Sequence, residues 1–307
     1  MGKSKSLVYF IIVGVMIIWG LNVTAIKIIV THFPAITITS VRIFVAFLSI
    51  SPILFVGKLF RKLTKKELAL ILCITVTGVL GHHTFLSVGL SKTMASNAGL
   101  ILGAVPLSTS IFAMLILGER FTVHRLLGII FGMIGVAMIV LAGSEEGLKL
   151  RVGDLYIVLA VITQAISFIF IKMASKTIDV RLITGITFFF GSFLLFAVSL
   201  GLEPGGVAQL AGGPLYVWIV FFASGIVATG VGHLLYNNAI KHIGPTETSV
   251  FLNMTPFFSL VGAYVFLGET FVLTHLFGFI FIVAGVVFGT GVVEQFVHRK
   301  VEKGVEG

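Results

Sequence analysis

The stretch LGERFTVHRLLGIIFGMIGV at residues 117–136 recurs as LGETFVLTHLFGFIFIVAGV at residues 267–286. At a constant offset of 150 (267 − 117), ten of these twenty positions are identical. The identical residues of the first copy, each repeated 150 positions later, are Leu117, Gly118, Glu119, Phe121, Leu126, Gly128, Ile130, Phe131, Gly135 and Val136. A repeat at half the length of a 307-residue chain indicates a duplicated unit.

The same offset also relates residues outside the repeated stretch. Without a gap it aligns His83 with His233 and Pro106 with Pro256. The duplication therefore extends well beyond the glycine-rich motif, and we expect the two halves to fold alike.

The composition identifies the solvent in which this unit folds. The chain is 57% hydrophobic and 11% charged, with a mean hydropathy of +1.14. Soluble domains carry about 25% charged residues, whereas apolar runs of about 20 residues are typical of membrane spans. A single cysteine, Cys73, excludes an intrachain disulfide, and paired cysteines, HExxH and GxxxxGK[ST] are absent. We expect a lipid bilayer as solvent and no cofactor or metal.

Ten apolar segments are separated by short loops containing Gly, Pro and charged residues. They are continuous rather than alternating, which predicts helices and not barrel strands. The predicted spans are 7–30, 35–57, 68–90, 93–117, 123–143, 153–173, 182–201, 215–239, 245–267 and 273–294. The first run is too long for a signal peptide, so we expect it to be retained.

The distribution of Lys and Arg predicts the orientation. With a cytoplasmic N-terminus, sixteen basic residues lie on the inner side: Lys3, Lys5, Lys58, Arg61, Lys62, Lys65, Lys66, Arg120, Arg125, Lys172, Lys176, Arg181, Lys241, Arg299, Lys300 and Lys303. Four lie outside: Lys27, Lys92, Lys149 and Arg151. This positive-inside bias predicts an inner (plasma) membrane protein with both termini in the cytoplasm. It also explains the net charge of +9 without nucleic acid as a partner.

An odd number of spans per repeat turns the second copy upside down. Residues 1–147 and 148–298 each contain five spans, and residues 299–307 form a cytoplasmic tail. Inverted repeats around a central site are a recurrent architecture of secondary transporters. The predicted fold is therefore an all-α membrane protein, with ten transmembrane helices in two inverted five-helix repeats around a central cavity.

Several motifs resemble those of the drug/metabolite transporter superfamily, specifically its ten-span EamA-type exporters. The matching pieces are Trp19-Gly20-Leu21-Asn22 with Lys27, Arg42 in the second span, and the two proline-containing spans that end in Leu117-Gly118-Glu119 and Leu267-Gly268-Glu269. The resemblance covers the whole chain. It implies export of small metabolites such as amino acids through a cavity formed by spans 1, 3, 4, 6, 8 and 9.

Polar residues near the middle of the first and sixth spans are candidate substrate ligands. At an offset of 145 (172 − 27), Trp19 aligns with Gln164 and Asn22 with Ser167. Positions i and i+3 share a helix face, so each half presents a polar stripe that could line a water-accessible cavity. Hydrogen bonding between helices is the alternative.

Histidines of the third and eighth spans are further candidates. His82 and His83 lie in span 3, and His233 and Tyr236 lie in span 8. Ionisable residues in a membrane usually face the bundle interior, and histidine titrates near neutral pH. One of them could bind substrate and carry a coupling proton. Alternatively, each is a neutral histidine bonded to a backbone carbonyl.

Pro106 and Pro256 predict kinks near the middle of spans 4 and 9, because proline removes a backbone donor and clashes with the preceding turn. Asn253 lies three residues before Pro256, on the same face, and is a candidate ligand. The kinks are either hinges that shape the cavity or static bends.

Three charged residues have structural alternatives. Glu119 and Glu269 precede helices, and we expect each to cap the helix that follows it; substrate contact is the other interpretation. Arg42 could bind a carboxylate, pair within the protein, or extend its charge to the nearby surface.

No Asp or Glu lies at the middle of a predicted span. The sequence therefore favours a secondary exporter of small neutral or zwitterionic metabolites that works by alternating access, as a monomer or homodimer with possible proton coupling. An uptake or facilitative carrier of the same fold is the first alternative. An intramembrane enzyme using His82 or His83, which lacks a matched nucleophile, and a non-transporting sensor are the others.

Overall fold

The computed structural model describes residues 2–118, 122–142, 151–243, 251–270 and 272–289. These residues form helices and connecting turns, with no strand among them. Within these described ranges, seven helices are long and apolar enough to cross a membrane, and the apolar segments Leu126–Ile139, Phe251–Leu267 and Leu273–Phe288 are shorter. The expected all-α membrane fold is confirmed for this part of the chain, and the arrangement of ten inverted crossings stays a prediction.

The elements of the first half follow the predicted spans closely. They are α1 (Gly2–His32), α2 (Ala35–Val56), α3 (Lys65–Ile74), η1 (Thr75–Gly81), α4 (His82–Lys92), α5 (Ala95–Leu102), α6 (Val105–Leu117) and α7 (Val123–Ala142). The boundaries of α2 and α7 differ from the predicted ones by a single residue, because turn residues mark these helix ends.

The second half repeats this order. Its elements are α8 (Val152–Ala174), α9 (Val180–Leu202), α10 (Gly206–Gln209), η2 (Leu210–Gly212), α11 (Leu215–Phe222), η3 (Ala223–Val231), α12 (Gly232–Ile243), η4 (Phe251–Met254), α14 (Thr255–Leu267) and α15 (Leu273–Gly289). The short α10 and η2 lie in the connection between α9 and α11, for which the sequence predicts only a loop between two spans.

Two predicted helices contain wide turns that the sequence does not predict. The π-helices η1 and η3 continue α3 into α4 and α11 into α12. They occupy related places in the two halves, because η1 ends just before His82 and His83, and η3 ends just before Gly232 and His233. π-Helical turns are frequent at functional sites.

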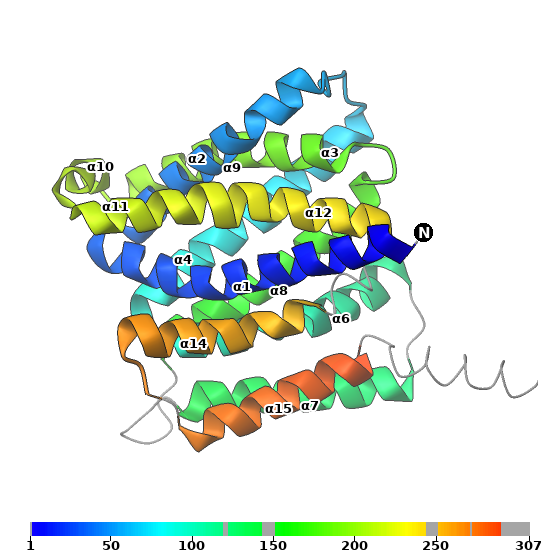
Figure 1. The fold of residues 1–307 in the computed structure, drawn as a ribbon, viewed down its shortest axis with the longest axis vertical. Coiled ribbons are helices and arrows are strands. Elements are labelled where there is room, and N and C mark those ends of the chain that lie inside the picture. The colour runs from blue at the N-terminus through cyan, green and yellow to red at the C-terminus, as the bar shows by residue number, and fades with distance from the viewer. Residues whose placement is uncertain (1, 119–121, 143–150, 244–250, 271, 290–307) are drawn as a thin grey trace, which may run out of the picture.

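The long helices run side by side, and α7 and α15 form an adjacent pair at one end of the molecule (Figure 1). Glycines let these two backbones approach. A Cβ atom added at Gly135 would lie 2.6 Å from the carbonyl oxygen of Gly278, and one added at Gly285 would lie 2.6 Å from the backbone nitrogen of Gly132. Small residues at such crossings are typical of membrane helices.

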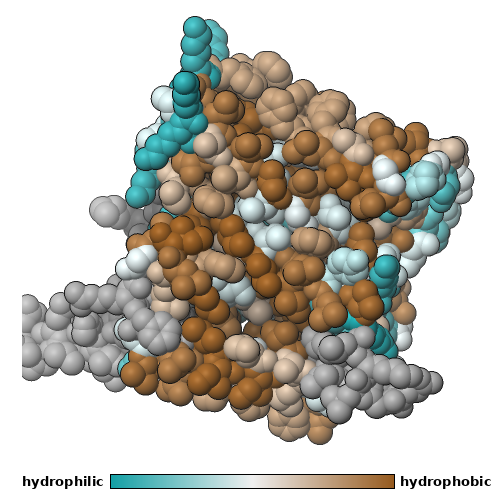
Figure 2. Space-filling model, turned by 180° about the vertical axis from the view of Figure 1, so that it is seen from behind, coloured by the Kyte–Doolittle hydropathy of each residue, from teal (hydrophilic) through white to brown (hydrophobic). Residues whose placement is uncertain are grey.

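The surface has the pattern expected of a protein in a bilayer. Hydrophilic residues gather at two opposite edges in Figure 2, and apolar residues cover the area between them. A pale patch of intermediate polarity interrupts this apolar area near its centre. With the apolar helices, this surface identifies a multi-pass membrane protein.

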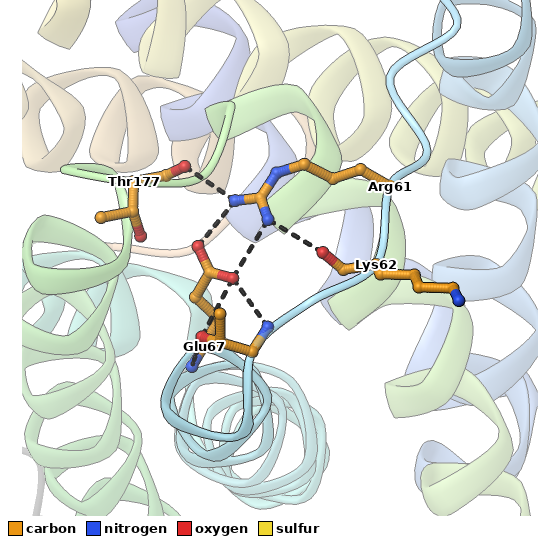
Figure 3. A network of polar contacts seen from close by, with 5 residues as sticks. Arg61, Lys62, Glu67 and Thr177 are labelled. Carbon is orange, nitrogen blue, oxygen red and sulfur yellow. Dashed lines mark hydrogen bonds and ion pairs between the residues drawn. The ribbon is translucent and has the colours of Figure 1, made fainter.

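A hydrogen-bonded network in the loop after α2 stabilises one edge of the molecule (Figure 3). Arg61 Nη2 lies 2.6 Å from Glu67 Oε1 and donates to the carbonyl of Thr177 at 2.8 Å. Glu67 also forms a capping box with Thr64 at the start of α3. The hydrogen bonds that Arg61 donates to the Glu67 carboxylate raise the pKa of Arg61 above its ordinary value. The network holds the α2–α3 and α8–α9 loops at one face.

Candidate functional site

A cluster of polar side chains lies where α1, α2, α4 and η3 meet. Its centre is Arg42 of α2, which is only 2% exposed. Arg42 Nη1 donates to Thr229 Oγ1 at 2.8 Å and contacts Ser224 Oγ at 3.5 Å. Its Nη2 donates to His83 Nδ1 at 3.4 Å. The guanidinium therefore points into the protein and does not extend to the surface, which excludes that alternative.

Asn22 belongs to this cluster through a second residue of η3. Ser224 donates a hydrogen bond of 2.6 Å to Asn22 Oδ1. Asn22 is partly exposed near the middle of α1. Of the two interpretations of Asn22, the structure shows the helix-to-helix hydrogen bond, while the partial exposure leaves the amide accessible from one side.

The geometry of η3 explains how it collects these contacts. A π-turn widens the helix and changes the direction of its carbonyl groups. Trp19 Nε1 donates to the carbonyl of Ala228 at 2.8 Å, and His233 Nδ1 to that of Thr229 at 2.8 Å. Thr229 Oγ1 donates to the carbonyl of Ser224 at 3.0 Å. Backbone groups of η3 therefore bind side chains from α1 and α12.

An aromatic wall, formed by Trp19, His233 and Tyr236, lies directly beside the polar cluster. The ring centroid of Trp19 is 4.9 Å from that of His233 and 5.0 Å from that of Tyr236. Phe188 of α9 contacts His233 at 5.5 Å, and Phe168 of α8 stacks on Tyr236 at 6.5 Å. Three predicted site residues, Trp19, His233 and Tyr236, are thus in contact, and they border Arg42 through Thr229.

The two histidines of α4 have different surroundings. His82 Nδ1 donates to the carbonyl of Ala160 in α8 at 3.0 Å, as expected for a neutral histidine that joins two helices. His83 Nδ1 accepts from Arg42, so this nitrogen carries no proton in the present arrangement. The two rings are 4.9 Å apart.

The remaining predicted ligands lie apart from these contacts. Gln164 is partly buried on α8, and Asn253 is partly buried on η4. Ser167 is fully buried against η1, since a Cβ added at Gly78 would lie 2.2 Å from its Oγ. Ser167 therefore packs at the contact between α8 and η1. Although the offset of 145 aligns Ser167 with Asn22, the two side chains have different surroundings.

The two prolines interrupt their helices as expected. Pro106 lies in the first turn of α6, after a break at Gly103 and Ala104, and Pro256 lies in the first turn of α14. A Cβ added at Gly103 would lie 2.8 Å from Pro256 Cγ, so the two breaks pack against each other. Whether they act as hinges stays a prediction.

Glu269 is a cap, but not of the helix expected from the sequence. Its carboxylate accepts hydrogen bonds of 2.8 Å from the backbone N–H groups of Ala95 and Ser96, at the start of α5. The prediction that it caps the helix that follows it, α15, is wrong, because its carboxylate binds the first N–H groups of a helix in the other half. Glu119 lies outside the described residues.

Lys27 and Asp154 make hydrogen bonds at one end of the bundle, away from the polar cluster around Arg42. Lys27 Nζ donates to the carbonyls of Leu90 and Thr93 at 2.7 Å, which satisfies the end of α4. Thr93 Oγ1 donates to Asp154 Oδ1 in the first turn of α8. A carboxylate there is favoured by the helix dipole, so both charged groups have structural roles.

Nothing in the sequence indicates the roles that several of these residues have in the structure. Ser224 and Thr229 look like ordinary small residues of an apolar helix, and Glu203 looks like a loop residue. Glu203 in fact binds the first turn of α2, through the backbone N–H groups of Ile36 at 2.9 Å and Thr37 at 2.7 Å. Among the described residues, no group of three or more His, Cys, Asp and Glu could hold a metal ion.

The apolar helices and the buried polar cluster around Arg42 define a multi-pass membrane protein with hydrogen-bonding side chains in its interior. Two stretches of the chain, residues 6–141 and 151–290, match the model of the EamA-like transporter family. The protein belongs to the EamA-like transporter family. This confirms the resemblance found in the sequence and indicates a transporter rather than an enzyme.

Curated relatives agree with this family. The chain is 29% identical to the uncharacterized transporter YyaM of Bacillus subtilis over 71% of this chain and 72% of YyaM. It is 24% identical to the uncharacterized transporter YetK of the same organism, over 92% of this chain and 87% of YetK. A solved crystal structure matches with a TM-score of 0.64 at 15% identity, covering 96% of this chain and 99% of the other. At that identity the likeness shows the fold alone.

Proposed function

We propose that the protein is a secondary transporter that exports small neutral or zwitterionic metabolites, such as amino acids, by alternating access between two inverted halves. It resides in the inner (plasma) membrane with both termini in the cytoplasm. The observation that carries this proposal is the buried polar cluster around Arg42, whose hydrogen bonds join α2 to η3.

Polar side chains in the middle of membrane helices support a substrate site there. Asn22, Trp19 and His233 are partly exposed. Trp19 and Asn22 lie in the middle part of the apolar helix α1, and His233 follows η3 at the start of α12. Polar groups are costly against lipid, and in membrane proteins they usually face a water-filled cavity or a protein interior. A small metabolite that enters beside these side chains would meet hydrogen-bonding groups together with an aromatic wall.

The related positions of η1 and η3 support two halves that share one site. Each π-helix packs on the second long helix of the other half. A Cβ added at Gly230 of η3 would lie 2.0 Å from Ser49 Oγ of α2, and one added at Gly191 of α9 would lie 2.3 Å from Val79 Cγ1 of η1. The family model also matches once in each half. Movement of one half against the other would open the cluster to the two sides in turn.

Transport by purified protein in proteoliposomes tests the proposal. We expect saturable flux of at least one amino acid or related metabolite, and counterflow when the vesicles are preloaded with the same compound. Everted vesicles separate export from uptake, and an imposed pH gradient reveals proton coupling. Absence of saturable flux across a panel of amino acids, drugs and related metabolites, with folded protein, contradicts it.

A further inference from the structure

The charge of Arg42 has no acidic counterpart in the part of the chain that the structure describes. Its hydrogen-bond partners are Thr229, Ser224 and His83, which are all neutral in this arrangement. Glu67 pairs with Arg61 and Asp179 pairs with Arg181, so neither carboxylate is a partner of Arg42. A permanent positive charge is therefore buried among neutral groups.

Burial of an unpaired charge is unfavourable, because the low-dielectric interior gives back little of the lost hydration. Charged residues inside membrane proteins are rare and mark the paths of ions and substrates. Arg42 does not recover this hydration at the surface, because it is among the largest fully buried side chains. An anionic group supplied from outside the chain would complete this pairing.

Resting on the proposed function, we propose that Arg42 binds the carboxylate of the transported metabolite. A guanidinium offers five N–H donors in a planar fork that matches a carboxylate. Two of the contacts that Arg42 makes, to Ser224 at 3.5 Å and to His83 at 3.4 Å, are long. They involve both terminal nitrogens, so a carboxylate can replace these two weak contacts with two strong ones.

The groups around the guanidinium suit such a ligand. Ser224 is already shared with Asn22, whose partial exposure opens one side of the cluster. Thr229 binds Arg42 through its hydroxyl and His233 through its carbonyl, so the aromatic wall begins one residue away from the guanidinium. The wall of Trp19, His233 and Tyr236 can pack against an apolar or aromatic body.

This assignment narrows the proposed substrate class. Among neutral and zwitterionic metabolites, it favours zwitterions that carry one carboxylate and an apolar or aromatic body, as many amino acids do. A neutral metabolite without a carboxylate would leave the charge of Arg42 unpaired. The carboxamide of the same compound keeps its shape and loses its negative charge, so acid and amide form a matched pair of probes.

The experiment measures ligand-induced thermal stabilisation of the purified full-length protein, which reports binding to the folded state. The probes are the protein amino acids, 3-phenylpropionate and 4-methylpentanoate, each with its carboxamide. We expect the acids to stabilise the wild-type protein and to bind about 10- to 100-fold more tightly than the amides, the range typical of a hydrogen bond to a charged group. Arg42→Gln should abolish this preference, and Arg42→Lys should keep part of it.

Arg181→Gln is the matched control, because it removes the same charge from an arginine that lies at the surface and pairs with Asp179. It should keep the full preference for acids. If Arg42→Gln fails to fold, Arg42→Lys takes its place as the variant, and equal binding of acids and amides by the wild-type protein still overturns the inference.

Amides that bind as tightly as their acids to the wild-type protein overturn the inference, as does an unchanged preference in Arg42→Gln. If neutral compounds are then transported, the proposed function stands and the role of Arg42 alone fails. If no acid or amide stabilises the folded protein and no compound of the transport panel is carried, both proposals fail.

Discussion

The carboxylate of Glu269 accepts hydrogen bonds of 2.8 Å from the backbone N–H groups of Ala95 and Ser96, so a residue near the end of the chain caps a helix of its first half. The first N–H groups of a helix have no partner within the helix. Glu203 serves α2 in the same manner, through Ile36 and Thr37. Carboxylates of the second half thus fix the starts of two helices of the first.

Removal of the Glu269 carboxylate should destabilise the protein. Glu269→Ala leaves two N–H groups at the start of α5 without a protein acceptor, which costs about 1–2 kcal/mol. The thermal unfolding midpoint in detergent should fall, and Glu269→Gln, which keeps an acceptor, should lose less. A wild-type midpoint for Glu269→Ala would show that water replaces the cap without cost.

The glycine contact between α7 and α15 should be sensitive to one methyl group. A Cβ at Gly285 would lie 2.6 Å from the backbone nitrogen of Gly132, whereas one at Gly14 would meet nothing within 4 Å. Gly285→Ala should therefore destabilise by about 1–3 kcal/mol through overpacking. Gly14→Ala, the same substitution in another apolar helix, should be neutral or slightly stabilising. Thermal unfolding of the two variants side by side checks the difference, and equal midpoints would argue against a close crossing.

Trp19 should report binding of the substrate by its fluorescence. The chain has two tryptophans. Trp19 contacts His233 and Tyr236, while Trp218 packs on Phe33 with ring centroids 5.0 Å apart. In Trp218→Phe, a carboxylate ligand should shift or quench the emission, because it changes the surroundings of Trp19. In Trp19→Phe the response should disappear. A response that follows Trp218 instead would place the site outside the cluster.

The loop network of Figure 3 should protect the α2–α3 connection from proteases. Arg61 binds Glu67 at 2.6 Å and the carbonyl of Thr177 at 2.8 Å, which ties two loops together. Arg61→Gln should raise the rate of cleavage by trypsin at Lys62 in inside-out vesicles. Lys176→Gln, which alters an exposed charge of the partner loop, serves as the control. An unchanged cleavage rate in Arg61→Gln would show that the network does not order the loop.

Accessibility of single cysteines should establish the topology. Cys73 is the one cysteine of the sequence, so Cys73→Ser provides a clean background. In intact cells a membrane-impermeant maleimide should label Ser91→Cys and Gly212→Cys, at positions expected outside. It should leave Lys62→Cys and Lys176→Cys unlabelled until the membrane is opened. Labelling of all four positions from outside would contradict the inverted arrangement, and labelling of the two lysine positions alone would contradict the expected orientation of the termini.

Much of this protein was predictable from its sequence, for a physical reason. A segment that crosses a bilayer needs apolar side chains, and its backbone groups must form hydrogen bonds within the segment. Composition and segment length therefore identify the helices without tertiary information. The bounds of α2, Ala35–Val56, differ by one residue from the prediction because punctuating residues lie next to them. The repeat is likewise visible wherever identical letters recur, as with His83 and His233.

The partners of individual side chains required the tertiary structure. Trp19, His233 and Tyr236 are predicted as one site, and Trp19 contacts both of the others because α1 packs against α12. Ser167, chosen by the same reasoning, packs against Gly78 because a small side chain suits a close helix contact.

The sequence by itself determined the solvent, the helices, the duplication and the family, since these depend on properties of local segments and on their recurrence. Tertiary structure decided that Arg42 is buried beside Thr229 and that Glu269 caps α5. Both depend on groups more than 170 residues apart in the chain (229 − 42 = 187 and 269 − 95 = 174). A hydrogen bond needs its two atoms within about 3 Å, and the packing of whole helices, rather than any local pattern, brings such distant groups together.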